Sequence, residues 1–194
     1  MKNVLLLLAQ GFEAYEASVF TDVLGWSRHV GDTPVNVTTA GRRTHIKCTW
    51  NFTVIPELQV DEIDVAHFDA LALPGGFKES KFYEDAYHED FLRIIRQFHA
   101  SGKIIASICV GALPLGKSGI LKGKNATTYH LLNGVRRKQL ESFGAHVKDQ
   151  PVVVDGNIIT STSPATALEV AFVLLEMLTA TDNMCKVRTA MGFA

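Results

Sequence analysis

Short apolar runs alternate along the chain with longer segments that are apolar on one face only. Residues 4–8, 70–73 and 103–108 form continuous apolar runs without alternation, which is typical of strands covered on both faces of a parallel sheet. The segments after Gln10-Gly11 and over residues 85–100 repeat apolar residues every three or four positions, which predicts helices. Strands that alternate with helices in this way indicate an α/β fold.

Weaker patterns predict the remaining elements. Residues 35–39 and 125–130 favour strands, and residues 46–55 favour an antiparallel ribbon in which Trp50 and Phe52 pack on a sheet face. Residues 152–160 predict a hairpin with its turn at 155–157, and Ser163-Pro164 begins a helix that runs to about Leu178. The tail to residue 194 carries no predicted element.

Composition limits the class of protein. The chain has 194 residues, 47% hydrophobic and 20% charged, with a net charge of −1. These values predict one globular domain, 1–194, without a basic surface for nucleic acid or anionic membranes. The apolar run at residues 4–9 is too short to span a bilayer and lacks a cleavage site, so we expect a cytoplasmic protein.

The cysteines and histidines carry no metal-site or disulfide pattern. Cys48, Cys109 and Cys185 are odd in number and far apart, without a CxxC pair, so we expect reduced thiols. The histidines show neither HxH nor HExxH spacing. We therefore expect no metal and no organic cofactor.

The run 103–108 leads directly into a segment that is predicted to be helical from Val110. Cys109 therefore lies on a sharp strand-to-helix turn, and the small residues Ser107 and Gly111 lie two positions on either side. This is the spacing of a nucleophile elbow, with sulfur as the nucleophile. Because helix N-termini favour anions, we expect a lowered thiol pKa. The alternative is a buried structural cysteine.

Glu16 occupies an unusual position in the first predicted helix. On a helical wheel it falls near the centre of the apolar arc that includes Phe12, Val19 and Phe20, whereas Glu13 lies toward the edge. A carboxylate on a core-facing stripe is costly unless it is protonated or paired. Glu16 is therefore a candidate acid, and the alternative for both residues is a first-turn carboxylate that interacts with the helix dipole.

Three further segments lie at the same predicted edge of the sheet. Gly75 and Gly76 follow a strand, and the N–H of Gly76 together with that of Val110 is predicted to form an oxyanion hole. The alternative is a simple glycine turn. His130, after Tyr129, is the candidate general base, with a surface histidine as its alternative.

Several motifs in the same order resemble the ThiJ/PfpI family, also called the DJ-1 superfamily. They are residues 8–16 with Asp22-Val23-Leu24, Leu73-Pro74-Gly75-Gly76, residues 106–111, Ala126-Thr127-Thr128 and residues 155–161. The resemblance covers the chain from end to end. It implies a flavodoxin-like three-layer sandwich with a mostly parallel sheet and helices on both faces, as in class I glutamine amidotransferases. It also implies a Cys109 nucleophile poised against Glu16, and a homodimer.

The chain departs from the family pattern at the site. Val110 replaces the histidine that follows the cysteine in the protease and amidase branch. Tyr129 separates the threonine pair from His130, so the pattern leaves open which of these two residues faces Cys109. The ribbon after Cys48 contains Trp50-Asn51. Residues 161–164 lack the arginine that the best-studied branch has there. These changes leave the substrate open.

The favoured hypothesis is glyoxalase-like or deglycase-like chemistry on a small-molecule carbonyl substrate. The Cys109 thiolate would attack an α-oxoaldehyde and Glu16 would move the proton, with His130 assisting. One alternative is an oxidative-stress sensor or chaperone that acts through oxidation of Cys109. A second alternative is an intracellular cysteine peptidase, amidase or isonitrile hydratase, and Val110 argues against the peptidase.

Overall fold

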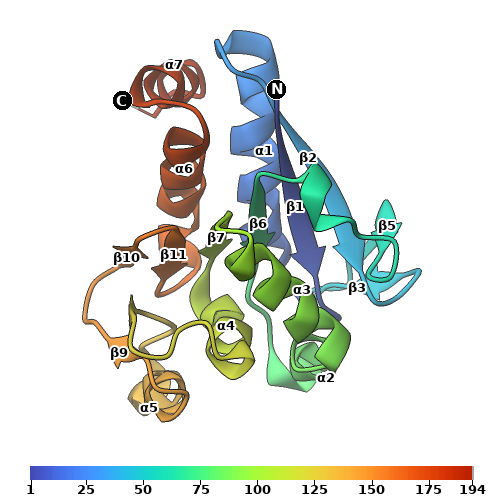
Figure 1. The fold of residues 1–194 in the computed structure, drawn as a ribbon, viewed down its shortest axis with the longest axis vertical. Helices are drawn as coiled ribbons and strands as arrows, with labels where there is room; N and C mark the ends of the chain where they lie inside the picture. The colour runs from blue at the N-terminus through green and yellow to red at the C-terminus, as the bar shows by residue number, and fades with distance from the viewer. Residues whose placement is uncertain (194) are drawn as a thin grey trace.

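A seven-stranded sheet forms the centre of the molecule (Figure 1), and the computed structural model describes residues 1–193. Its strand order is β10-β11-β7-β6-β1-β2-β5, and every neighbouring pair is parallel except β10–β11. The strands of this sheet are β1 Lys2–Leu8, β2 Val35–Gly41, β5 Leu58–Gln59, β6 Ala70–Leu73, β7 Ile104–Ser107, β10 Val152–Asp155 and β11 Ile158–Ser161. The predicted α/β fold with a mostly parallel sheet is confirmed.

Helices cover both faces of this sheet. Helices α1 and α6 lie against each other over one face, and α3 packs on β6 and β7 over the other (Figure 1). The α-helices are α1 Ala14–Val30, α2 Phe82–Ala86, α3 Glu89–Ala100, α4 Ala112–Ser118, α5 Val135–Ser142, α6 Ala167–Leu178 and α7 Thr181–Ala190. The 3-10 helices are η1 Val65–His67, η2 Lys78–Ser80, η3 Cys109–Gly111, η4 Leu132–Gly134 and η5 Pro164–Thr166.

The strands at the centre of the sheet explain the continuous apolar runs. All four residues of β6 are buried, because helices cover the sheet on both sides. In the register, Leu71 lies beside Ile105 and Leu73 beside Ser107, so β6 and β7 end together. The loops that follow β1, β6 and β7 therefore meet at the carboxyl edge of the sheet, where open α/β folds place their binding sites.

The predicted strand at residues 125–130 is much shorter than expected. Only β8, Asn125–Ala126, is extended, and it pairs with β9, His146–Val147. The next residues bind elsewhere: Thr127 N–H donates to Thr160 Oγ1, and Thr128 Oγ1 donates to the carbonyl of Cys109. These tertiary hydrogen bonds replace a strand ladder, which local propensity does not reveal.

The predicted ribbon at residues 46–55 is an antiparallel pair of β3, Ile46–Lys47, and β4, Thr53–Val54. The prediction that Trp50 and Phe52 pack on a sheet face is wrong, because they are 65% and 69% exposed. The loop instead folds around Cys48, whose sulfur accepts the N–H groups of Trp50 and Phe52 at 3.3 and 3.1 Å. The backbone thus points inward and the aromatic rings point outward.

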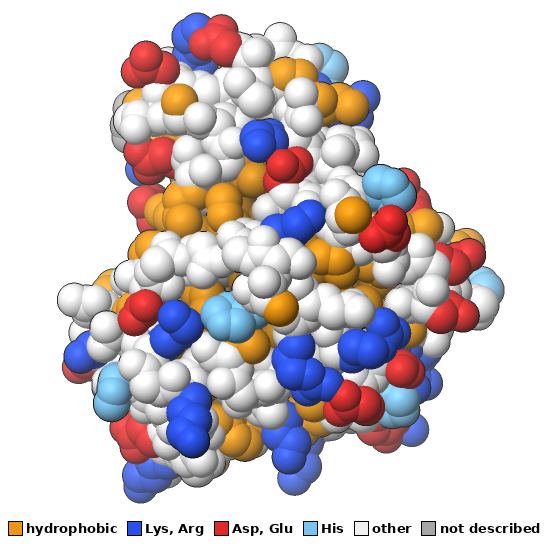
Figure 2. Space-filling view, in the orientation of Figure 1, with side chains coloured by type: hydrophobic (Ala, Val, Ile, Leu, Met, Phe, Trp, Pro, Cys, Tyr) orange, Lys and Arg blue, Asp and Glu red, His pale blue; other side chains and the backbone are white. Residues whose placement is uncertain are grey.

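Basic and acidic side chains are mixed over the face that Figure 2 shows. One carboxylate is an exception: Asp85 is fully buried and accepts hydrogen bonds from Arg42, Arg43 and the N–H of Gln10. These ion pairs lower the pKa of Asp85 against the opposing effect of its burial. No helix in residues 1–193 is both long enough and apolar enough to cross a membrane.

The C-terminal segment, for which no element was predicted, forms helix α7 and is fixed to the rest of the fold by Asn183. Its Oδ1 accepts the N–H groups of Asp32 and Thr33 at 2.6 and 3.0 Å. Its Nδ2 donates to the carbonyl of Thr33 and to Thr179 Oγ1. Asn183 is 2% exposed, so this side chain joins α7 to the loop after α1 inside the protein.

Asn183→Ala is expected to lower the free energy of unfolding by about 2 kcal/mol, because two backbone N–H groups lose their acceptor. Urea denaturation of the variant beside the wild type measures this loss. Thr189→Ala is the matched control, since Thr189 lies exposed on the same helix. Equal free energies for Asn183→Ala and Thr189→Ala would contradict the assigned role.

Candidate active site

Cys109 lies at the carboxyl end of β7 on the predicted elbow. Its φ angle is +56°, a left-handed conformation that is unusual for a residue with a side chain. The N–H of Ile108 donates to Leu73 O, and that of Gly111 donates to Ile108 O. The helix predicted from Val110 begins later, at Ala112, because the first turn is the tighter η3. The elbow leaves Cys109 only 6% exposed.

Gly111 is required by the close approach of two loops. A Cβ at this position would lie 2.9 Å from Leu73 O and 3.1 Å from Pro74 O. On the other side of the cysteine, the buried Ser107 side chain faces the carbonyl of Ile159 at 3.4 Å. The predicted need for a small residue after Cys109 is therefore confirmed at Gly111, whereas the need at Ser107 stays a prediction.

Glu16 is completely buried in the first turn of α1, at the position indicated by the helical wheel. Its Oε2 accepts the N–H of Gly75 at 2.6 Å, whereas Oε1 is buried and has no partner among residues 1–193. Burial, followed by the charge of Glu13, raises the pKa of Glu16 to about 8. Glu16 is therefore mostly protonated at neutral pH.

The thiol of Cys109 and the carboxyl of Glu16 perturb each other. Burial and then the negative charge of Glu16 raise the pKa of Cys109 well above its usual value, while the Val110 N–H lowers it. The predicted lowering of the thiol pKa is therefore wrong, because loss of water outweighs the helix N-terminus. Glu16 opposes the thiolate only when it is itself ionised, so its repulsion is weak below pH 8 or so.

The backbone N–H groups of Gly75 and Gly76 differ in whether they have a hydrogen-bond partner. The Gly75 N–H is occupied by Glu16, and a Cβ at Gly75 would lie 2.9 Å from that carboxylate. The bonds Glu13 N to Gly75 O and Phe77 N to Gly11 O hold the loop against the chain before α1. No hydrogen bond within residues 1–193 uses the Gly76 N–H. The predicted role of this amide in an oxyanion hole stays a prediction.

His130 and Tyr129 do not form hydrogen bonds with Cys109 within the described part of the chain. His130 is exposed, Tyr129 is half-buried, and their ring centroids are 6.5 Å apart. The segment reaches the elbow through Thr128 instead. A role for His130 as base stays a prediction, whereas the structure brings Cys109 and Glu16 together with the glycine loop.

Two residues near the elbow have no sequence signal. Tyr83 follows the glycine loop in the short α2, and Arg136 lies at the start of α5. The Tyr83 hydroxyl is buried without a partner in residues 1–193, and the Arg136 guanidinium lies 5.2 Å from its ring centroid. They are 53 positions apart in the sequence, so no spacing rule would have joined them.

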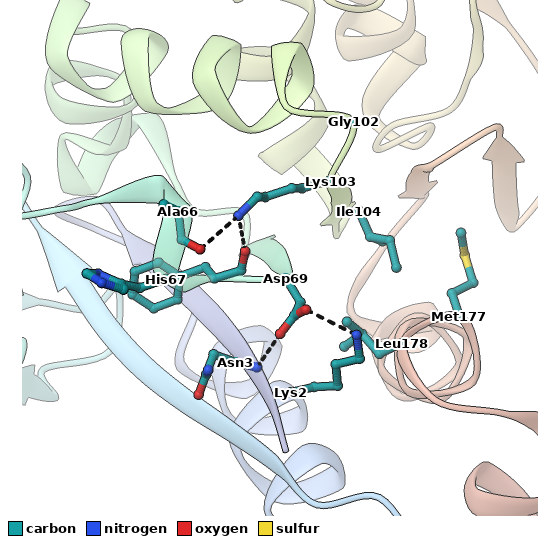
Figure 3. Close-up of a pocket in the computed structure, with 11 residues that line it drawn as sticks. Lys2, Asn3, Ala66, His67, Asp69, Gly102, Lys103, Ile104, Met177 and Leu178 are labelled. Carbon is teal, nitrogen blue, oxygen red and sulfur yellow. Dashed lines mark hydrogen bonds and ion pairs between the residues drawn. The ribbon is translucent and has the colours of Figure 1, made fainter.

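A separate pocket of about 490 Å³ lies at the opposite, amino edge of the sheet (Figure 3). Its cations are already bound: Lys2 pairs with Asp69 at 3.1 Å, and Lys103 donates to the carbonyls of Val65 and Phe68. It lies away from the elbow and contains no candidate nucleophile. Within residues 1–193, no group of three His, Cys, Asp or Glu side chains is placed to hold a metal ion.

Known proteins resemble this chain in both sequence and structure. The model of the DJ-1/PfpI family matches residues 2–177. Protein dj-1beta of Drosophila melanogaster is 33% identical over 190 residues, covering 96% of this chain and 94% of that protein. The crystal structure of Drosophila melanogaster DJ-1beta superposes with a TM-score of 0.85 at 29% identity, covering 100% of this chain and 98% of that one.

A similarity over a shorter stretch concerns a protein with a named activity. Deglycase PfpI of Pyrococcus furiosus is 35% identical over 113 residues, which covers 58% of this chain and 64% of that protein.

Proposed function

Because this chain belongs to the DJ-1/PfpI family, we propose that it converts small α-oxoaldehydes, or their adducts, through a covalent bond to Cys109. The observation that carries the proposal is the buried Glu16 beside the elbow thiol. Its pKa of about 8 keeps a proton available at neutral pH, and its Oε1 has no other partner in residues 1–193. A buried acid beside a nucleophile is suited to proton transfer on a bound carbonyl compound.

The first step is addition of the Cys109 thiol to the aldehyde carbon, C1, of methylglyoxal. The S–C1 bond forms, the C1=O π bond breaks, and the thiol proton ends on the former aldehyde oxygen. In this proposal the N–H groups of Gly76 and Val110 stabilise the negative charge that develops on that oxygen. The product of this step is a hemithioacetal.

The second step moves a proton between carbon and oxygen. Glu16 donates its proton to the ketone oxygen on C2 and then accepts the proton that leaves C1, which gives an enediol and returns Glu16 to its protonated form. Transfer of the remaining proton from the C1 hydroxyl to C2 produces an S-lactoyl thioester. The two carboxyl oxygens suit this exchange because Oε2 is anchored on Gly75 and Oε1 is free.

Water completes the cycle. It attacks C1 of the thioester, the C–S bond breaks, the sulfur recovers its proton, and lactate leaves. The sum is one methylglyoxal and one water to one lactate. An adduct of methylglyoxal with an amine enters the same cycle when the amine leaves from C1, which is consistent with the name of the deglycase relative.

Incubation of the purified protein with methylglyoxal, followed by measurement of lactate, tests the proposal. Butanedione is the control, because it has the same dicarbonyl unit without an aldehyde hydrogen for Glu16 to move. We expect lactate from methylglyoxal and no corresponding product from butanedione. Lactate formation no faster than in buffer would overturn the proposal.

A second candidate function uses the same two groups. A protonated Glu16 can donate a short hydrogen bond to a sulfinate oxygen on Cys109, which supports an oxidation sensor. The unpartnered Oε1 favours this alternative because it offers a site for that proton. Stoichiometric conversion of Cys109 to sulfinate by peroxide, in a protein that makes no lactate from methylglyoxal, would support it over the enzyme.

A further inference from the structure

The Tyr83 hydroxyl lacks a hydrogen-bond partner and the Arg136 guanidinium lacks an ion-pair partner within residues 1–193. The Tyr83 Oη atom is buried and has no hydrogen-bond partner within residues 1–193. Arg136 is half-buried and forms no ion pair with any described carboxylate, although its neighbour Arg137 pairs with Asp149 at 2.8 Å. A buried hydroxyl donor and a half-buried guanidinium are both stabilised by an anionic oxygen.

Tyr83 lies on α2, which packs beside the glycine loop, and Arg136 lies on α5, which packs on the helix that follows the elbow. The ring of Phe82 lies against Gly76, and its centroid is 5.2 Å from that of Tyr83. On the other side, α5 packs on α4, where Phe143 and Leu140 contact Gly116. Helix α4 follows the elbow directly, and α2, α4 and α5 are grouped together at one end of the molecule (Figure 1).

The side chains are held in place by their neighbours. The Arg136 guanidinium carbon lies 5.2 Å from the centre of the Tyr83 ring, which in turn packs on Tyr87 at 4.8 Å. Gln139 links the group: its Oε1 accepts from Arg136 at 3.0 Å and its Nε2 donates to the Tyr87 hydroxyl at 2.8 Å. This arrangement fixes Arg136 before any ligand binds, which reduces the entropic cost of binding.

Electrostatics also connect Tyr83 to the site. Burial raises the pKa of Tyr83 to about 12; the charge of Arg136 lowers it, while the charges of Cys109 and Glu79 raise it further. The phenol is therefore close enough to the thiol to respond to its charge. Tyr83 remains a hydrogen-bond donor throughout the neutral pH range.

We propose that Tyr83 and Arg136 form an anion subsite beside Cys109, which binds the carboxylate of a small α-oxoaldehyde or of its 2-hydroxy acid product. The reaction itself rests on the proposed function, and the subsite adds the class of compound that the site recognises. An α-oxoaldehyde with a carboxylate on the carbon after the ketone fits it as substrate, because it keeps both the aldehyde hydrogen and the ketone that the proposed cycle needs. Lactate, whose carboxylate forms at C1, fits it as product.

Alkylation of Cys109 tests the subsite without any catalytic turnover. Iodoacetate and iodoacetamide form the same S–CH₂ bond and release the same iodide, but only iodoacetate carries a carboxylate. We define the preference as the rate constant of iodoacetate at Cys109 divided by that of iodoacetamide, both measured by peptide mass spectrometry. Because both reagents need the thiolate, this ratio is insensitive to changes in the thiol pKa.

Arg136→Gln and Tyr83→Phe are each expected to lower this ratio by about tenfold, since each removes a charged or hydrogen-bonding contact to the carboxylate. Arg137→Gln is the matched control with the same loss of charge on the next residue, and we expect it to leave the ratio near that of the wild type. Equal ratios in all four proteins would overturn the subsite.

The outcome separates the subsite from the proposed reaction. If the wild type makes no lactate, the proposed reaction is ruled out, and the alkylation ratio still tests the subsite. If the wild type makes lactate but the variants have the same alkylation ratio as the wild type, the subsite is ruled out and the proposed reaction stands.

Discussion

Cys109→Ala is expected to reduce lactate formation from methylglyoxal by about a thousandfold or more, to the rate of the uncatalysed reaction. The reason is that every step of the proposed cycle takes place on a carbon bound to sulfur. Without the S–C1 bond, Glu16 has no oriented C1 hydrogen to remove, and the amides of Gly76 and Val110 have no oxyanion to stabilise. The effect should appear in kcat.

The matched control for this variant is Cys185→Ala, because Cys185 is exposed on α7, away from the elbow. It should retain the wild-type rate. Far-UV circular dichroism and the urea midpoint of Cys109→Ala establish that the fold is intact. Retention of more than about a tenth of the rate by a folded Cys109→Ala would contradict a covalent mechanism.

The free energy of unfolding of the wild type is expected to fall as the pH rises from about 5 to 8. The pKa of Glu16 is about 8 in the folded protein, against a usual value of 4.5. Between these values the folded state binds a proton that the unfolded chain has released, so the stability present below pH 4.5 is lost as the pH passes through 8. The slope approaches about 1.4 kcal/mol per pH unit at its steepest.

Glu16→Gln should remove most of this slope, since the amide keeps the shape of the protonated acid and does not titrate. Urea denaturation of both proteins at a series of pH values measures the difference. Asp85 affects stability in a separate pH range. Its pKa is lowered in the folded protein, so it stabilises the fold above pH 3.8, its usual pKa, and this stability is lost only in more acidic solution. Parallel stability curves for wild type and Glu16→Gln between pH 5 and 8 would contradict a buried, protonated Glu16.

Local rules were sufficient for the parts of the site that depend on neighbouring residues. The elbow followed from an apolar run, two small residues and a cysteine between them. Glu16 followed from its place on a helical wheel, because a core-facing position determines burial and burial determines the protonation state. Both inferences use spacings of only a few residues, over which secondary structure fixes geometry.

Features that depend on tertiary contacts were not available from the sequence. The exposure of Trp50 depends on how the loop around Cys48 folds, and the short β8 depends on hydrogen bonds from Thr127 to a distant strand. Tyr83 and Arg136 meet only because the fold brings α2 and α5 close together. The thiol pKa was predicted in the wrong direction because the helix N-terminus is visible in the sequence, whereas the extent of desolvation is not.

The coupling between Cys109 and Glu16 is tested most directly by a titration of the Cys109 thiolate by its absorbance at 240 nm, in the wild type and in Glu16→Gln, with Cys109→Ala as the blank. We expect the thiol to ionise at lower pH in Glu16→Gln than in the wild type, because the variant lacks the carboxylate charge that opposes the thiolate. Superimposable curves would mean that the two groups do not interact, and would contradict the coupled pair on which the proposed chemistry depends.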